Sequence, residues 1–241
     1  MNFRPKAVGI LADAQFRALI ISQATFDLSI FMRSTANSWV VFELTQSQLW
    51  VGLVAGVRAI PILFFALAGG VISDRLGRRN VMIGAGTLIA ASSAITAVLI
   101  SSELLVAWHM MVVSVLGGIG AALYGPAFYA LIADIVRSDR LVHANGILSV
   151  AQTTGEMFGP VIVGFTIAAS GAHTVFWLVV GGNAVGLMLL LRVREPERPQ
   201  SDASEQKPSF ASQFIEGLQY ARDTPPLLWL TLLVIAQNLF G

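Results

Sequence analysis

The stretch GGVISDRLGRRN (residues 69–80) places four charges within six residues, from Asp74 to Arg79, between two long apolar runs. Of the 241 residues, 55% are hydrophobic and only 12% are charged, against about 25% charged residues in globular domains. Uncharged runs at residues 80–102, 104–133 and 157–191 each exceed the roughly 20 residues that cross a bilayer core. The composition therefore predicts an all-α membrane protein, in which residues 69–80 connect two spans.

Turn signals and charges divide the apolar sequence into six complete spans and part of a seventh. The spans are expected at residues 16–42, 49–72, 81–100, 104–132, 142–168 and 174–191, which make one bundle over residues 16–191. Residues 1–15 precede the bundle, and residues 192–225 have the composition of a polar linker. The last apolar run, residues 226–241, is predicted to be a truncated seventh span of roughly 24 Å at 1.5 Å per residue.

Basic residues gather on one side of the predicted membrane. Of the 15 Lys and Arg residues, 13 fall in the N-terminal segment, residues 69–80, the loop after residue 133 and the linker. The loops predicted on the other side, ELTQSQ (43–48), SSE (101–103) and SGAH (170–173), contain none. The positive-inside rule predicts that the N-terminus, residues 69–80 and the linker are cytoplasmic.

Four ionisable side chains fall well inside the predicted spans, namely Asp27, Arg33, Arg58 and Glu156. Each would cost about 2.5 to 3.5 kcal/mol on insertion scales if it faced lipid, so such groups are expected to be buried against a partner or a water-filled cavity. Two interpretations remain open. One is a structural ion pair, for example between Asp27 and Arg58, and the other is a polar cavity that serves transport.

Helical geometry favours the cavity. Four polar residues of the fifth span recur at steps of four, three and four, which keeps them on one face. They are Asn145, Ser149, Gln152 and Glu156. Gln23 and Asp27 begin a similar polar face on the first span. The first and fifth spans are therefore predicted to line a cavity, and the third and sixth spans to be peripheral.

A glycine and proline bend is predicted beside Glu156. Gly155 and Gly159 form a small-xxx-small pair, followed by Pro160. Glycines permit close helix approach, and proline frees a backbone carbonyl and bends the helix. The segment is either an ordinary tight contact or a moving part, and Glu156 beside it is a candidate proton carrier.

Two motifs resemble those of the major facilitator superfamily. The loop at residues 69–80 is similar to the signature G-x-L-x-D-R-x-G-R-R, with Ile72 in the leucine position, and GEMFGP (155–160) resembles the antiporter signature G-x-x-x-G-P. The matching residues of the loop are Gly70, Asp74, Arg75, Gly77, Arg78 and Arg79. Residues 16–54 and 134–149 resemble the branch that contains macrolide efflux proteins and the enterobactin exporter. One departure is Ser114, which stands where drug antiporters often carry an arginine.

The resemblance implies a transporter of two six-helix bundles that rock about a central site, each bundle being an inverted pair of three-helix units. This chain would supply the N-terminal bundle, and its partners would be the lipid bilayer, a small-molecule cargo and the C-terminal six-span bundle. The implied location is a plasma membrane of the bacterial inner-membrane type. The expected function is proton-coupled efflux of amphipathic small molecules, of drug or siderophore type, by alternating access.

Two alternatives remain open: a nutrient symporter of the same superfamily, and a non-transporting half-transporter that acts as a receptor or assembly protein. The sequence has no cysteine and a net charge of +1, which argues against Cys-ligated metal and nucleic-acid binding. It contains no phosphate loop or zinc-protease motif. We therefore expect no enzyme activity and no cofactor, with a proton gradient as the energy source.

The charges of the loop at residues 69–80 are expected to differ in role. Arg75, Arg78 and Arg79 suffice to hold the loop in the cytoplasm. Asp74, at the carboxyl end of a helix, opposes the helix dipole and is expected to face a cation or another helix's N-terminus. The resemblance implies that it contacts the second bundle as half of a latch, with Gly70 allowing close approach and Gly77 a tight turn.

Overall fold

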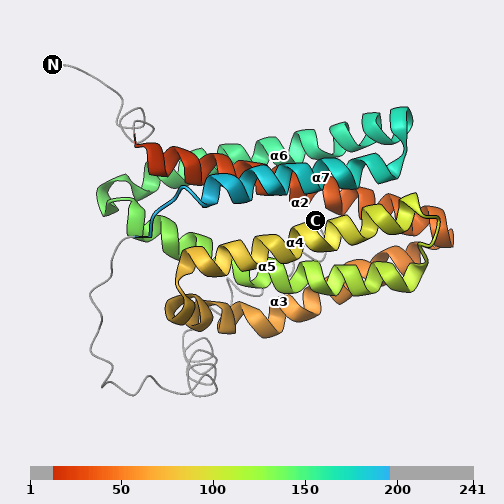
Figure 1. Cartoon of the computed structure of the whole chain (residues 1–241), viewed down its shortest axis with the longest axis horizontal. Coiled ribbons are helices and arrows are strands. Elements are labelled where there is room, and N and C mark those ends of the chain that lie inside the picture. The colour runs from red at the N-terminus through yellow and green to blue at the C-terminus, as the bar shows by residue number, and fades with distance from the viewer. Residues whose placement is uncertain (1–12, 196–241) are drawn as a thin grey trace, which may run out of the picture. The chain divides into compact units, whose positions relative to one another are not determined.

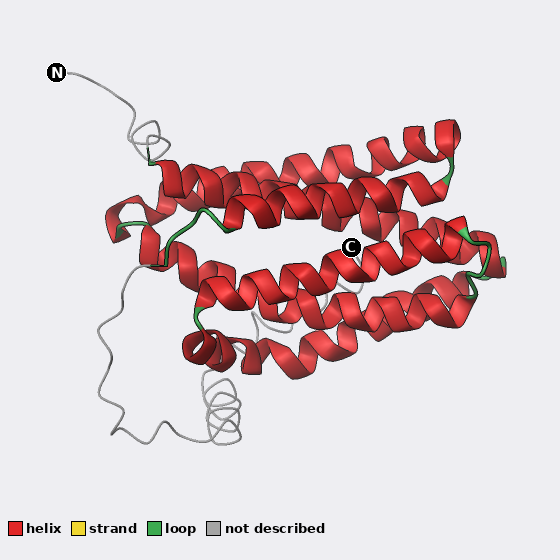
Figure 2. Ribbon diagram, in the orientation of Figure 1, coloured by secondary structure: helices red, strands yellow, loops and turns green. Residues whose placement is uncertain are grey.

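The computed structural model describes residues 13–195, which form six long α-helices and one 3-10 turn, with no strand in that range (Figures 1 and 2). The elements are α2 (Ala14–Thr45), α3 (Gln48–Leu76), α4 (Arg78–Ser101), α5 (Ala107–Ile135), η1 (Ser138–Arg140), α6 (Leu141–Ser170) and α7 (Ala172–Leu190). Each predicted span coincides with one helix, so the predicted all-α bundle is confirmed. The predicted seventh span, and the linker beyond residue 195, lie outside the described residues.

Three of these helices, α4, α5 and α7, are long and apolar enough to cross a membrane by length and composition alone. Helices α2 and α6 contain 32 and 30 residues and are also long enough. They carry the polar stripes that the sequence places on the first and fifth spans, which lower their hydropathy. These are the two helices that were predicted to line a cavity.

The helices pack in a pattern with internal symmetry. Helix α2 packs against α6 and α7, α5 packs against α3 and α4, and α4 contacts α7 (Figure 1). Exchanging α2 with α5, α3 with α6 and α4 with α7 leaves this pattern unchanged. The main contacts of α2 to α4 therefore match those of α5 to α7, which agrees with the two three-helix units that the superfamily resemblance implies.

Close backbone contact between α6 and α2 depends on two glycines. A Cβ atom added at Gly159 would lie 2.8 Å from the Cβ atom of Phe31 and 3.2 Å from the backbone nitrogen of Met32. Gly155 abuts the backbone one turn earlier, at Leu28. Because apolar surface gains little by leaving lipid for a helix interface, such close van der Waals packing is what holds membrane helices together.

The α3–α5 contact is made in the same way. A Cβ atom added at Gly118 of α5 would lie 2.5 Å from the carbonyl oxygen of Arg58 and 2.8 Å from Cγ of Pro61. Both neighbours are rigid, since one is backbone and the other is a proline ring inside α3. In both helix pairs, the glycines belong to the unit formed by α5 to α7.

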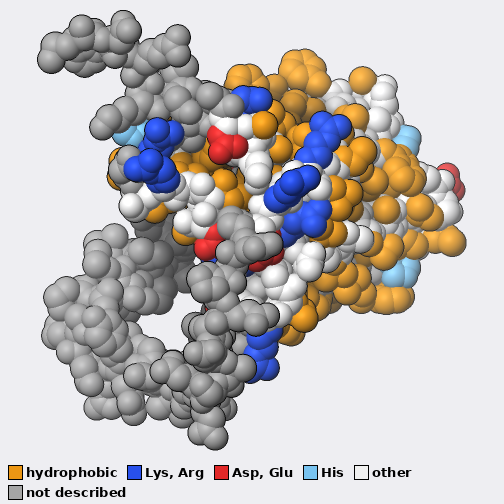
Figure 3. All heavy atoms as spheres, turned by 60° about the vertical axis from the view of Figure 1, so that its left-hand side comes forward, with side chains coloured by type: hydrophobic (Ala, Val, Ile, Leu, Met, Phe, Trp, Pro, Cys, Tyr) orange, Lys and Arg blue, Asp and Glu red, His pale blue; other side chains and the backbone are white. Residues whose placement is uncertain are grey.

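Charged residues divide the bundle into two different ends. At one end α2 begins, α7 ends, and the chain passes from α3 to α4 and from α5 to α6; we call this the basic end (Figure 1). Arginines gather there, as Figure 3 shows. They are Arg17, Arg75, Arg78, Arg79, Arg137, Arg140, Arg192 and Arg194. The loops at the opposite end carry Glu43 and Glu103 instead, so the predicted charge asymmetry is a property of the folded bundle.

Candidate functional site

Helices α2, α4, α5 and α6 enclose a cavity of about 160 Å³ around Asp27, which we call the acid cavity. Its polar lining residues are Gln23, Asp27, Tyr124, Tyr129 and Gln152. Nε2 of Gln23 donates a hydrogen bond to Oδ1 of Asp27 over 2.9 Å, one turn along α2. The structure therefore brings together three of the predicted site residues, Gln23, Asp27 and Gln152, from the two helices with polar stripes.

Aromatic rings form one wall of the acid cavity. The ring centroids of Phe26 and Tyr124 are 4.7 Å apart, and those of Phe128 and Tyr129 are 5.4 Å apart. The hydroxyl of Tyr124 is buried. Aromatic faces attract cations and cover apolar surface, so this wall and the Asp27 carboxylate together suit an amphipathic molecule. The cavity is smaller than a complete drug site of about 300 Å³ or more, and would hold part of such a molecule.

Glu156 lies at the level of Asp27 but not in the acid cavity. A Cβ atom added at its neighbour Gly155 would lie 3.3 Å from the carbonyl carbon of Asp27, which fixes the two carboxylates at a similar height. Because α6 turns its glycine face toward α2, the side chain of Glu156 is exposed on the described bundle. The expectation that Glu156 is buried is therefore wrong for this bundle. The whole stripe of Asn145, Ser149, Gln152 and Glu156 is exposed, which fits one shared polar face.

The two arginines inside the spans lie apart from Asp27. Arg33 is 4% exposed, and its Nη2 atom has no hydrogen-bond partner in the described part of the chain. Arg58 is half-buried, and its Nε atom is likewise unpaired there. Between residues 13 and 195 no ion pair joins either arginine to Asp27. The residues that were predicted to share one cavity therefore do not all lie together. The ion pair considered for Asp27 and Arg58 is absent from the described bundle.

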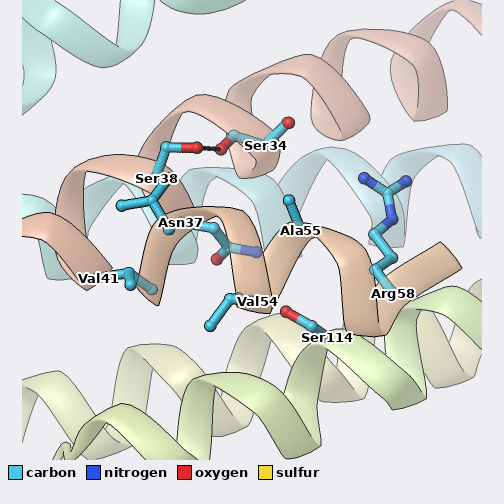
Figure 4. Close-up of a pocket in the computed structure, with 9 residues that line it drawn as sticks. Ser34, Asn37, Ser38, Val41, Val54, Ala55, Arg58 and Ser114 are labelled. Carbon is cyan, nitrogen blue, oxygen red and sulfur yellow. Dashed lines mark hydrogen bonds between the residues drawn. The ribbon is translucent and has the colours of Figure 1, made fainter. Parts of the chain in front are cut away.

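A second cavity, of about 80 Å³, lies between α2, α3 and α5, and we call it the arginine pocket. Its lining residues are Ser34, Asn37, Ser38, Val41, Val51, Val54, Ala55, Arg58 and Ser114. Figure 4 shows Arg58 at the end of the pocket opposite Val41. Ser114 stands where drug antiporters often carry an arginine. In this structure it lines the same pocket as Arg58, an arginine of α3. No acidic side chain lines this pocket.

At the basic end, the charged loop between α3 and α4 makes defined contacts. Gly77 has φ +86°, which favours glycine and gives the predicted tight turn. Arg78 binds two carboxylates, with Nη1 at 2.7 Å from Oδ2 of Asp134 and Nη2 at 3.3 Å from Oδ1 of Asp74, and it also donates to the carbonyl of Ala130. Asp74 thus faces a cation, as its position at a helix carboxyl end requires.

Other residues of the loop have different surroundings. Arg75 is exposed. Nothing in the described bundle approaches Gly70 within 4 Å of an added Cβ atom, whereas its neighbour Gly69 packs 3.0 Å from the carbonyl oxygen of Ala122. The close approach predicted at Gly70 is therefore not made within residues 13–195.

Glu195 completes the basic end by capping α4. Its carboxylate oxygens accept hydrogen bonds from the backbone nitrogens of Arg78 and Arg79, over 3.0 and 3.2 Å. The carboxyl end of α7 is capped by a cation in return. Nε and Nη2 of Arg79 donate hydrogen bonds to the carbonyls of Leu190 and Leu191 there, over 3.2 and 2.7 Å. Each charge thus lies at the helix end whose dipole attracts it.

Glu195 and Asp134 were not among the site residues predicted from the sequence. Glu195 was assigned to a linker, although one signal was available. Helix α4 begins with two arginines, and its N-cap position, Gly77, has no side chain to bind the free N–H groups. Such groups need a partner from elsewhere when they are not solvated, and an acid is the natural one.

Comparison with known proteins places these features in a family. The model of the family described as transmembrane secretion effector, within the major facilitator superfamily, matches residues 6–240. Multidrug efflux pump Tap of Mycolicibacterium fortuitum is 27% identical over 212 residues, which are 85% of this chain and 52% of that protein. Macrolide efflux protein A of Streptococcus pyogenes is 25% identical over 211 residues, 85% of this chain and 51% of that protein.

Multidrug resistance protein 1 of Bacillus subtilis is 29% identical over 204 residues, 84% of this chain and 49% of that protein. The chain therefore spans about half the length of these curated relatives. Within the described residues, no group of three or more His, Asp or Glu side chains is placed to hold a metal ion.

Proposed function

The chain belongs to the transmembrane secretion effector family of the major facilitator superfamily, and on that premise we propose that it acts as the N-terminal half of an exporter of amphipathic small molecules. The family is one of multi-pass membrane transporters and not of enzymes. The acid cavity is the observation that carries the proposal, because it combines one carboxylate with an aromatic wall. Relatives named for multidrug and macrolide efflux support this cargo class.

In this proposal a proton gradient drives export. Asp27 binds the polar part of the cargo, and Glu156, at the same level on α6, carries the proton. Gly155 and Gly159 pack α6 closely against α2, so that the two helices move together. Pro160 supplies a bend in α6 beside Glu156. Rocking of the two bundles would then change the surroundings of both carboxylates together, which is how alternating access couples proton and cargo.

The basic end is proposed to lie in the cytoplasm of a bacterial cell, with the bundle in the plasma membrane. Positively charged loops are retained on that side, and this end carries the described arginines outside the spans. Asp74 is half of the proposed latch with the second bundle. Its side chain is 48% exposed although it pairs with Arg78, so it remains accessible to a further partner.

Transport by the full-length protein in proteoliposomes tests the proposal. An imposed proton gradient is expected to drive ethidium, an amphipathic cation, in the direction opposite to proton flow. Glu156→Gln is expected to abolish this gradient-driven movement, whereas the control Glu43→Gln, an exposed acid at the opposite end of the bundle, is expected to leave it unchanged. Movement of cargo together with protons would instead identify a symporter, and no movement of any probe would favour a non-transporting protein.

The latch has its own test in the same vesicles. Asp74→Asn in the full-length protein is expected to reduce the ethidium rate while leaving the amount of inserted, folded protein unchanged. Full activity of this variant would leave the loop with a topological role only.

A further inference from the structure

Within residues 13–195, two cationic side chains inside the bundle have no anion to balance them. Arg33 is 4% exposed with Nη2 unpaired, and Arg58 has an unpaired Nε. The acids at comparable depth are Asp27, which accepts from Gln23, and Glu156, which faces outward. Buried guanidinium groups in a membrane are normally paired or solvated. Arg33 and Arg58 therefore lack a partner among the described residues.

Both arginines contact one turn of α5, Arg33 through its guanidinium group and Arg58 through its backbone. A Cβ atom added at Gly117 would overlap the Arg33 guanidinium, with Cζ at 3.0 Å, so that only glycine leaves room for the charge there. The next residue, Gly118, contacts the carbonyl oxygen of Arg58. A buried cation that has no partner in the described bundle defines a place where an anion would be stabilised.

The arginine pocket lies beside this pair and has the right lining for an anion. Arg58, Asn37 and Ser114 reach it from α3, α2 and α5, and Asn37 lies one turn after Arg33 on α2. An amide and hydroxyl groups can donate hydrogen bonds to an anion, and no acid is present to repel it. The volume of about 80 Å³ exceeds that of one ordered water, whose share of liquid is about 30 Å³, but is far below a drug site.

We propose that Arg58, Asn37 and Ser114, beside the buried charge of Arg33, form a binding site for one small monovalent anion, either a free halide such as chloride or a single carboxylate group. The site is separate from the acid cavity and does not require that the protein exports anything. Bound anion stabilises the junction of α2, α3 and α5, since it balances positive charge that has no partner within the described bundle.

Thermal unfolding of the full-length protein in lipid nanodiscs tests the site. At constant ionic strength and sodium concentration, replacing bulky isethionate by chloride or by formate is expected to raise Tm by at least about 2 °C. Arg33→Gln and Arg58→Gln are each expected to remove the anion-dependent rise. The control Arg192→Gln, an exposed arginine at the end of α7, is expected to keep it.

The two anions distinguish the possible sources. A rise with both anions supports a site open to free halide, and a rise with formate alone supports a site for the carboxylate of a larger ligand. Equal Tm values in all three salts would overturn the proposal, as would a rise that persists in both glutamine variants. If Arg33→Gln does not fold, Arg58→Lys provides the second variant, because a point charge without the planar guanidinium is expected to weaken the anion effect.

Discussion

The acid cavity and the arginine pocket are built on the same two helices and are opposite in character. Both use α2 and α5, but the acid cavity joins Asp27 to an aromatic wall, whereas the arginine pocket joins Arg58 to serine and asparagine side chains. Pairing Asp27 with an arginine would have neutralised both charges inside the bundle. Because the chain keeps them apart, each charge remains available to a ligand of opposite sign, which a structural ion pair would not allow.

The largest effect is expected at Gly118, the glycine through which α5 packs against α3 beside the arginine pocket. Gly118→Val would place a Cβ atom 2.5 Å from the Arg58 carbonyl oxygen and 2.8 Å from the Pro61 ring. Because neither neighbour yields, we expect the free energy of unfolding to fall by about 1 to 3 kcal/mol or more, measured as Tm and as the folded fraction in size-exclusion chromatography. Gly84→Val is the control, since nothing lies within 4 Å of a Cβ atom there. Equal Tm values for the two variants would show that α3 and α5 are not held by this contact.

A substitution at Asp27 is expected to affect the acid cavity and to leave the arginine pocket unchanged. Asp27→Asn is expected to lower ethidium transport about tenfold or more, as removal of a charged hydrogen-bonding partner does, while the anion-dependent rise in Tm stays intact. Arg58→Gln is expected to remove that rise. Transport assays and melting curves on the same preparations measure both effects. A loss of the anion effect in Asp27→Asn would mean that the two cavities act as one site.

A residue outside both regions provides a smaller, purely structural effect. Glu195→Ala removes the acceptor for two N–H groups at the start of α4, so we expect a loss of about 1 kcal/mol of stability. Ethidium binding and the anion effect are expected to persist in this variant. Glu43→Ala, which changes an exposed acid at the opposite end of the bundle, is the control for melting. An unchanged Tm for Glu195→Ala would show that solvent caps α4 equally well.

The smallest effect is expected at Arg75. Its side chain is exposed, so Arg75→Gln is expected to change stability by less than about 0.5 kcal/mol. Arg78→Gln, which loses contacts with Asp74 and Asp134, is expected to lower Tm further. Melting curves of both variants measure the difference. Similar losses for the two would contradict the unequal roles that the structure gives to the arginines of one motif.

The helices could be predicted from the sequence because membrane spans obey a single strong rule. Long uncharged runs must be helical in lipid, since every backbone group needs an internal partner. The polar face shared by Gln23 and Asp27 followed from the helical period. Which charges meet did not follow, because the partner of a side chain depends on how neighbouring helices are rotated. For that reason Arg58 was considered as a partner for Asp27, and Glu156 was expected to be buried.

The basic end was less predictable than the spans. Glu195 and Asp134 reach the α3–α4 loop from distant parts of the sequence, and no local pattern links them to Arg78. Only the uncapped start of α4 indicated that an acid was needed.

The cap on α4 also sets an order of events during biosynthesis. Glu195 lies 116 residues after Arg79 along the chain, so a ribosome working at about 5 to 20 residues per second reaches it roughly 6 to 23 seconds later. Until then, the amino end of α4 lacks the acid that caps it, and Arg79 lacks the carbonyl groups at the end of α7 to which it donates. The basic end therefore closes only when the last helix of the bundle has been made, and its closure marks the completion of the six-helix unit.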